Sequence, residues 1–257
     1  MRYFIKFGYI GTDFTGFQKG NGARSVEDSI LAKLQSIGVT SPISSAARTD
    51  REVSAIGNVF SVEYNGNIKN LMALLNKGSA SLFYLAYSPV ESSLRPRHSS
   101  MKVYRYLCSS YSKRMLEPHL RKFTGTHDFS HFSRRDGRNP VRTIDRIDIV
   151  DYGTFTAIDF WGKSFIWQQI RRIMGFVFSQ IEEERDDDPF SYSRAVKPAP
   201  PQQLILLDVR YPGIVFTPFR EKSLERILIE KTRRSFYTFL LFEHIISSLD
   251  SIYTGKS

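Results

Sequence analysis

The chain has 257 residues, of which 41% are hydrophobic and 14% aromatic, enough for one large or two small domains with buried cores. Its 36 lysines and arginines against 26 aspartates and glutamates give a formal net charge of +10. Six of the acids lie within residues 182–188, so the rest of the chain is more basic still. This balance favours a polyanionic partner, although a basic charge can also serve solubility alone.

Cysteine usage excludes a disulfide-stabilised fold, and hydropathy excludes a protein with a membrane-spanning helix. The single cysteine, Cys108, rules out an internal disulfide and fits a reducing compartment. No apolar run reaches the roughly 18 residues that a membrane-spanning helix needs. We therefore expect a cytoplasmic protein without a membrane span.

The first part of the chain predicts strands and helices in the order β-α-β-α-β. Residues 2–9 alternate as a strand with one apolar face does. Ser25 and Asp28 have the spacing of a capping box, and the apolar stripe behind them predicts a helix that ends near Gly38. Further along, the pattern predicts a strand over 58–64, a short helix over 71–77 and a strand over 82–87. This order is typical of a compact α+β domain.

The second part of the chain follows a segment rich in proline and serine, 88–100, which we interpret as a domain linker. Its pattern predicts strands over 102–107 and 204–211, a hairpin of 146–150 with 155–161, and helices over 115–123 and from about 166 to 181. Residues 221–252 look mainly helical, for packing or dimer contact. We expect two domains, 1–95 and 96–257, the second with an extra C-terminal helical tail.

The segment 46–51, with sequence AARTDR, places one carboxylate between two arginines in a loop that leads into a strand. Nearby guanidinium groups favour the ionised carboxylate, and an ionised Asp50 can act as a nucleophile. The plainer interpretation is a surface ion pair of Asp50 with Arg48 or Arg51. Charge pattern alone favours this plainer interpretation, because such pairs are common.

Several motifs together resemble one known family. Arg-Thr-Asp resembles the nucleophile loop of the tRNA pseudouridine synthase A (TruA) family, and residues 8–18 match that family's opening Tyr-x-Gly-Thr-x-Phe-x-Gly-x-Gln. Residues 125–132 resemble its Gly-x-x-Asp-Phe-x-x-Phe segment, and residues 165–175 resemble its helix with an arginine and a following glycine. The matches keep the family's order to about Pro212.

The resemblance implies a fold and an activity. The fold would be α+β, with two ferredoxin-like or RRM-like lobes whose antiparallel sheets meet at a central basic cleft. The activity would be isomerisation of uridine to pseudouridine on the 3′ side of the tRNA anticodon stem-loop. This reaction requires no cofactor and no metal, and the family works as a homodimer. His127 and His131 lack a third ligand nearby, so a metal site is not expected.

The resemblance also implies three catalytic residues. Asp50 would be the nucleophile, and Arg171 would pair with it. Tyr104, the first tyrosine of the family's Tyr-x-Tyr, would line the site and stack on the base. From pattern alone, Tyr104 is more simply a core strand residue and Arg171 part of a polar helix face.

Basic residues near these motifs are candidates for substrate binding. Arg48 would grip a phosphate or fill the stack that the flipped base leaves. The basic loop 133–142 contains Arg134 and Arg135, which we expect at the tRNA backbone. A merely solvated loop is the alternative for residues 133–142.

Three positions depart from the family pattern: Ala47 and Glu52 replace glycines, and Ser54 replaces a histidine. Ala47 is a mild change unless a positive φ is needed there. Glu52 brings a second carboxylate close to Asp50, or faces solvent. The departures keep two alternatives open: a non-catalytic RNA-binding protein on the same scaffold, or a pseudouridine synthase that acts on a different RNA site.

Overall fold

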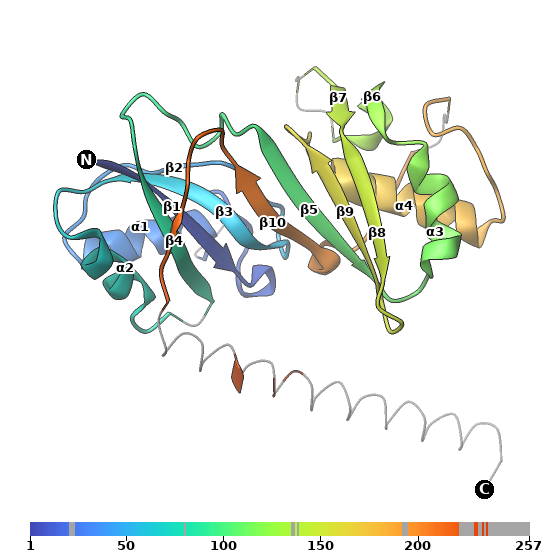
Figure 1. Ribbon diagram of the computed structural model, residues 1–257. Coiled ribbons are helices and arrows are strands. Elements are labelled where there is room, and N and C mark those ends of the chain that lie inside the picture. Colours follow the sequence, from blue (N-terminus) through green and yellow to red (C-terminus); the bar gives the residue numbers. More distant parts are fainter. Residues whose placement is uncertain are drawn as a thin grey trace, which may run out of the picture.

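The computed structural model describes residues 1–20, 24–79, 81–134, 137, 139–191 and 195–220, together with 229, 230, 233 and 235. Nine strands form the main sheet: β1 (Arg2–Tyr9), β2 (Ser44–Ser45), β3 (Ser54–Glu63), β4 (Leu82–Val90), β5 (Met101–Cys108), β8 (Arg146–Asp151), β9 (Thr156–Gly162), β10 (Leu204–Arg210) and β11 (Thr217–Pro218). They are ordered β11-β4-β1-β3-β10-β5-β9-β8, with β2 beside β3 (Figure 1). A separate pair consists of β6 (Gly125–Asp128) and β7 (Val141–Ile144).

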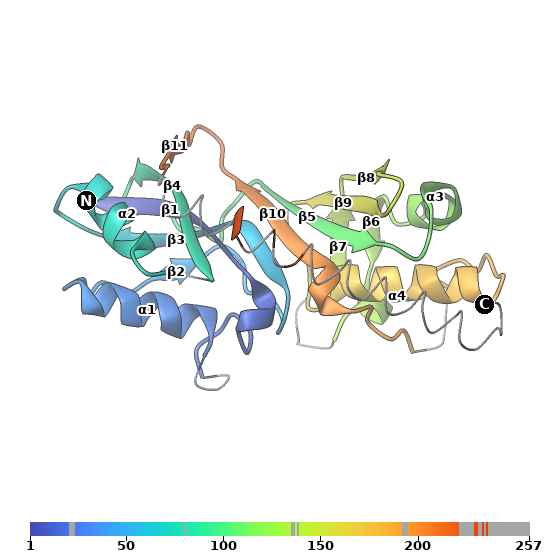
Figure 2. The same ribbon diagram turned by 90° about the horizontal axis from the view of Figure 1, so that it is seen from below.

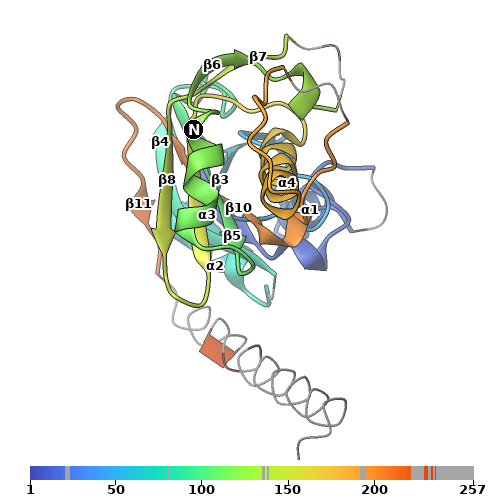
Figure 3. The same ribbon diagram turned by 90° about the vertical axis from the view of Figure 1, so that its right-hand side faces the viewer.

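In the described part of the chain before residue 221, the sheet is accompanied by the α-helices α1 (Val26–Ser36), α2 (Ile68–Asn76), α3 (Lys113–Arg121) and α4 (Gln169–Glu182). Short 3-10 turns occur at η1 (Gly11–Asp13), η2 (Ser130–Phe132) and η3 (Pro201–Gln203). The helices α1 and α4 lie on the same side of the sheet, at its two ends (Figures 2 and 3). The α+β class and the predominance of antiparallel pairing are therefore as expected.

Local sequence signals explain where α1 begins and ends. The Ser25 hydroxyl accepts a hydrogen bond from the Asp28 backbone N–H at 3.0 Å, so Ser25 caps the helix, and the same hydroxyl donates to the Asp28 carboxylate at 2.6 Å. The helix buries Val26, Ile30 and Leu34 against the sheet core. Gly38 follows the helix with φ of +78°, the left-handed conformation that glycine adopts at little cost.

The sheet is continuous, whereas we expected a separate sheet in each lobe. Strand β10 joins the two parts of the chain, because it pairs parallel with β3 and antiparallel with β5. The backbones approach closely at this junction: a Cβ on Gly57 would lie 2.1 Å from the carbonyl oxygen of Leu207. Periodicity predicted β10 as a strand but carries no information about its partners, which are distant in sequence.

Two predicted boundaries were wrong. The strand β4 continues to Val90, where Val90 pairs with Arg2 of β1, so the first residues of the expected linker belong to the sheet. Pro89 is tolerated because it lies beyond Ala86 and Tyr87, the two β4 residues that pair with β11. The basic loop is shorter than expected, because β7 takes its last residues into pairing with β6.

Two sequence predictions concern the end of the chain and membranes. The predicted helix over 221–252 falls almost wholly outside the described residues, so it stays a prediction. Among the described residues, we find no helix that combines the length and the apolar character needed to cross a bilayer.

The close approach at Gly57 gives a test of the sheet junction. We expect Gly57→Ala to destabilise the protein by about 1–3 kcal/mol, because backbone atoms must move to admit the methyl group. Gly66→Ala is the control, since the atoms nearest its Cβ belong to the end of the Tyr64 side chain and not to backbone. Urea unfolding of both variants measures the difference. Equal losses would contradict a tight β3–β10 junction.

Candidate active site

Asp50 lies in the loop between β2 and β3, and the opening motif of the chain supports this loop. The Tyr9 hydroxyl lies 2.8 Å from the Thr49 hydroxyl, within hydrogen-bond distance. The backbone N–H of Phe17 donates to the Thr49 carbonyl at 3.3 Å. Gly11 packs against the loop so closely that a Cβ there would lie 2.4 Å from the Val53 carbonyl. The two matched motifs, residues 8–18 and 46–51, are thus one structural unit.

The partner of Asp50 comes from the other part of the chain. Arg171 Nη1 lies 2.8 Å from Asp50 Oδ2, and the two side chains are 11% and 22% exposed. Arg171 is fixed in turn, because its Nε donates to the Ala199 carbonyl at 2.9 Å. A pair this far from solvent is costly to break, since either charge would be left uncompensated.

The plainer interpretation of the loop was wrong, because it placed the ion pair within the loop itself. Arg48 is exposed and donates instead to the Gln18 side chain at 3.3 Å. Arg51 lies 3.7 Å from the carboxylate of Glu52. The charge pattern along the sequence favours an ion pair between residues that are adjacent in sequence, whereas the fold gives Asp50 a buried partner 121 residues away.

Gly175 explains how α4 holds Arg171 in place. A Cβ on Gly175 would lie 1.9 Å from the Lys197 carbonyl oxygen, so α4 and the segment that follows it touch through their backbones. This contact brings the Ala199 carbonyl within reach of the Arg171 side chain, and the Ala199 N–H donates to the Arg171 carbonyl at 2.8 Å. Arg171 and Gly175 of the matched segment therefore both contribute to the contact with the segment around Ala199, which holds the Arg171 side chain in place.

Trp167 is a second donor to Asp50. Its indole Nε1 lies 2.9 Å from Asp50 Oδ1, while 40% of the residue remains exposed. The guanidinium carbon of Arg134 lies 4.4 Å from the centre of the indole ring, in a cation–π contact. Our sequence-based prediction missed Trp167. The available signal was a tryptophan, one of two in the chain, that lies within the matched segment 165–175 and two residues before α4 begins.

Tyr104 on β5 lies close to the same carboxylate. Burial raises the pKa of its hydroxyl, and the nearby Tyr9 and Asp50 raise it further. The phenol is therefore neutral at physiological pH. Its ring packs edge to face against Phe165, with the centroids 5.3 Å apart. The structure thus brings together Asp50, Tyr104 and Arg171, the three residues predicted to be catalytic.

Arg172 adds a third cation beside Arg171 and Arg134. Its Nη1 donates to the Val196 carbonyl at 2.6 Å. Burial lowers its pKa, and the charges of Arg171 and Arg134 lower it further. Arg134, Arg171 and Arg172 are therefore close enough to influence one another electrostatically.

The departures from the family pattern are accommodated locally. Glu52 has φ of +69°, which explains why a glycine suits this position. Its carboxylate accepts a hydrogen bond from Gln202 of η3. Ser54 accepts the backbone N–H of Gly11 at 2.9 Å. Ala47 is not among the described residues with positive φ, so its replacement of glycine is mild.

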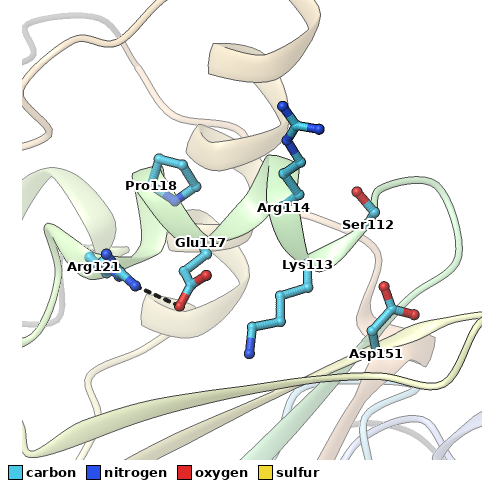
Figure 4. Close-up of a pocket in the computed structure, with 7 residues that line it drawn as sticks. All are labelled: Ser112, Lys113, Arg114, Glu117, Pro118, Arg121 and Asp151. Atoms are coloured by element: carbon cyan, nitrogen blue, oxygen red, sulfur yellow. Dashed lines mark hydrogen bonds and ion pairs between the residues drawn. The ribbon is translucent and has the colours of Figure 1, made fainter.

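Three further observations concern metal ligands, Arg135 and a depression elsewhere on the molecule. The described residues include no group of three or more His, Cys, Asp and Glu side chains that could hold a metal. Arg135, expected at the tRNA backbone, lies outside the described residues. A depression of about 500 Å³ lies elsewhere, beside α3 (Figure 4), and none of the predicted catalytic residues lines it; its lining is Ser112, Lys113, Arg114, Glu117, Pro118, Arg121 and Asp151.

Comparisons with known proteins show the family of the chain. A family model described as tRNA pseudouridine synthase matches residues 120–212. The tRNA pseudouridine synthase A of Picrophilus torridus is 41% identical over 86% of this chain and 86% of its own length. That of Thermoplasma acidophilum is 38% identical over 95% and 96%. The chain belongs to the tRNA pseudouridine synthase A family.

Among solved structures, a crystal structure of a Cbf5-Nop10-Gar1 complex is distantly similar. Its TM-score is 0.40 at 11% sequence identity, over 79% of this chain and 48% of that chain.

The backbone at Glu52 allows a stability test. We expect Glu52→Gly to be more stable than Glu52→Ala by about 1 kcal/mol, because both lose the bond to Gln202 but only alanine keeps the strained positive φ. Chemical unfolding of the two variants gives the difference directly. Equal stability, or a more stable alanine variant, would show that the left-handed backbone is not maintained in solution.

Proposed function

We propose that the protein isomerises uridine to pseudouridine in tRNA, with Asp50 as the nucleophile. The observation that supports this most is the convergence of Asp50, Arg171 and Tyr104, from a loop, a helix and a strand that are distant in sequence. The family to which the chain belongs makes it an isomerase that acts on tRNA. Arg134, Arg171 and Arg172 give the positive surroundings that an RNA substrate needs.

The reaction exchanges one glycosidic bond for another. The C1′–N1 bond of the uridine breaks, the base turns, and C1′ bonds to C5. The proton on C5 leaves, and N1 gains one, so atoms and charge balance without an external oxidant or reductant. A carboxylate oxygen of Asp50 would add to C1′ or to an intermediate derived from the sugar.

Each neighbour of Asp50 has a role that its environment supports. Arg171 neutralises and orients the carboxylate, because it binds Oδ2 and is itself fixed by Ala199. Tyr104 presents a neutral phenol, whose ring would lie against the flipped base. Flipping costs a few kcal/mol, which binding of the RNA has to supply.

The finer features are proposals that rest on the resemblance. The substrate uridines would lie on the 3′ side of the anticodon stem-loop, with Arg48, Arg134 and Arg135 at the tRNA backbone. Each part of the chain, 1–95 and 96–257, would be a ferredoxin-like or RRM-like lobe, and the RNA would enter a basic cleft between them. The enzyme would be a cytoplasmic homodimer.

Pseudouridine mapping on unmodified tRNA transcripts, without added cofactor or metal, tests the activity. We expect the wild type to modify the anticodon arm, and Asp50→Ala to bind tRNA without modifying it. Arg171→Lys keeps the charge but loses the planar donor set that holds both Asp50 and Ala199, so the rate should fall on the order of 10²-fold. A wild type that binds tRNA and modifies no transcript would favour the RNA-binding alternative.

Salt dependence of tRNA binding tests the role of Arg134. Arg134→Ala should weaken binding and reduce the slope of log affinity against log salt by about one, because one phosphate contact is lost. Arg146→Ala is a matched control, since Arg146 also lies over a tryptophan ring, 4.2 Å from the centre of Trp161 on β9. Equal effects of the two variants would mean that Arg134 contributes only to the general charge.

A further inference from the structure

Each oxygen of the Asp50 carboxylate accepts a hydrogen bond from a side chain. Oδ2 accepts from Arg171 at 2.8 Å, and Oδ1 accepts from the indole N–H of Trp167 at 2.9 Å. A carboxylate that adds to C1′ needs a lone pair directed at carbon and free space in front of it. We propose that Trp167 is a latch on the nucleophile, which holds Oδ1 in the free protein and releases it when RNA binds. This inference rests on the proposed function and adds a regulatory step to it.

The two donors differ in how readily they can leave. Arg171 is charged, 11% exposed in its side chain, and held by the Ala199 carbonyl at 2.9 Å. Trp167 is a neutral donor and 40% exposed. Breaking the buried ion pair would leave two uncompensated charges, whereas the indole can exchange its bond for one with water. Trp167 is therefore the donor that withdraws.

The backbone around Trp167 is fixed, so its side chain is the part that can move. The Trp167 carbonyl accepts from the Arg134 N–H at 3.1 Å and from the Ser133 hydroxyl at 3.3 Å. On the other side, the Gln169 side chain accepts the Ile166 N–H at 3.0 Å. Release thus corresponds to rotation of an exposed side chain between rotamers, with no rearrangement of the fold.

Arg134 connects this rotation to RNA binding. In the free protein its guanidinium lies over the indole ring at 4.4 Å and holds the ring against Asp50. A phosphate oxygen forms a charge-assisted hydrogen bond to a guanidinium, which is stronger than an exposed cation–π contact. A phosphate that draws Arg134 away therefore removes the support of the ring. The freed indole then offers its face to a base.

The indole N–H gives a direct readout of the latch. The chain has two tryptophans, so Trp161→Phe leaves Trp167 as the only indole signal in an ¹H–¹⁵N spectrum. We expect the Trp167 resonance to move when a saturating unmodified tRNA transcript is added, toward its position in the Trp161→Phe/Asp50→Ala double variant. A resonance that keeps its free-state position in the RNA complex would overturn the latch.

Kinetics give an independent test. Trp167→Phe keeps an aromatic ring for Arg134 but removes the N–H donor. We expect its single-turnover rate of pseudouridine formation to rise about threefold to tenfold, because a hydrogen bond to a charged group no longer has to be broken. Trp161→Phe is the control for loss of a tryptophan. An unchanged or lower rate in a folded Trp167→Phe protein would overturn the latch.

The two tests separate failure of the latch from failure of the proposed function. If the wild type forms pseudouridine but the indole resonance is insensitive to RNA, the function stands and the latch is wrong. If no transcript is modified, the proposed function fails, and the indole spectrum still shows whether RNA displaces Trp167 from Asp50.

Discussion

The ion pair between Asp50 and Arg171 is the interaction on which the rest of the site depends. It joins a loop that precedes β3 to a helix that follows β9, so it forms only when the two parts of the chain are correctly placed. A carboxylate and a guanidinium that are largely removed from water are costly unless they meet with good geometry. The fold supplies this geometry through β10, which pairs with β3 on one side and β5 on the other.

Three glycines allow backbone segments around the site to approach one another closely. A Cβ would lie 2.4 Å from backbone at Gly11, 2.1 Å at Gly57 and 1.9 Å at Gly175. They fix the Asp50 loop against the first motif, β3 against β10, and α4 against the segment that holds Arg171. At Glu52, by contrast, a residue other than glycine adopts a positive φ. The hydrogen bond from Gln202 to the Glu52 carboxylate offsets part of the conformational cost. The site is thus built mainly from backbone contacts, which side-chain patterns do not report.

The sequence predicted most elements, since hydrophobic period and helix capping are local properties: the strand over 2–9 and the helix start at Ser25 were both confirmed. The resemblance to the family identified Asp50, Tyr104 and Arg171 as the candidate catalytic residues. The single sheet was missed, because which strands pair is a property of the whole chain. Trp167 was missed for a different reason: it belongs to no periodic pattern, and its importance arises only from its distance to Asp50.

The two hydrogen bonds to Asp50 differ in the charge and the burial of their donors, and this difference would suit the nucleophile that we propose. Arg171 is buried and charged, so in the proposed mechanism it would keep the carboxylate oriented before and during reaction. Two such cations would hold both oxygens too firmly for either to attack carbon. Trp167 offers a weaker, exposed donor instead, so that one oxygen can be uncovered at modest cost. A site with one fixed and one releasable donor can protect an ionised carboxylate in the free protein and still make it available when RNA is bound.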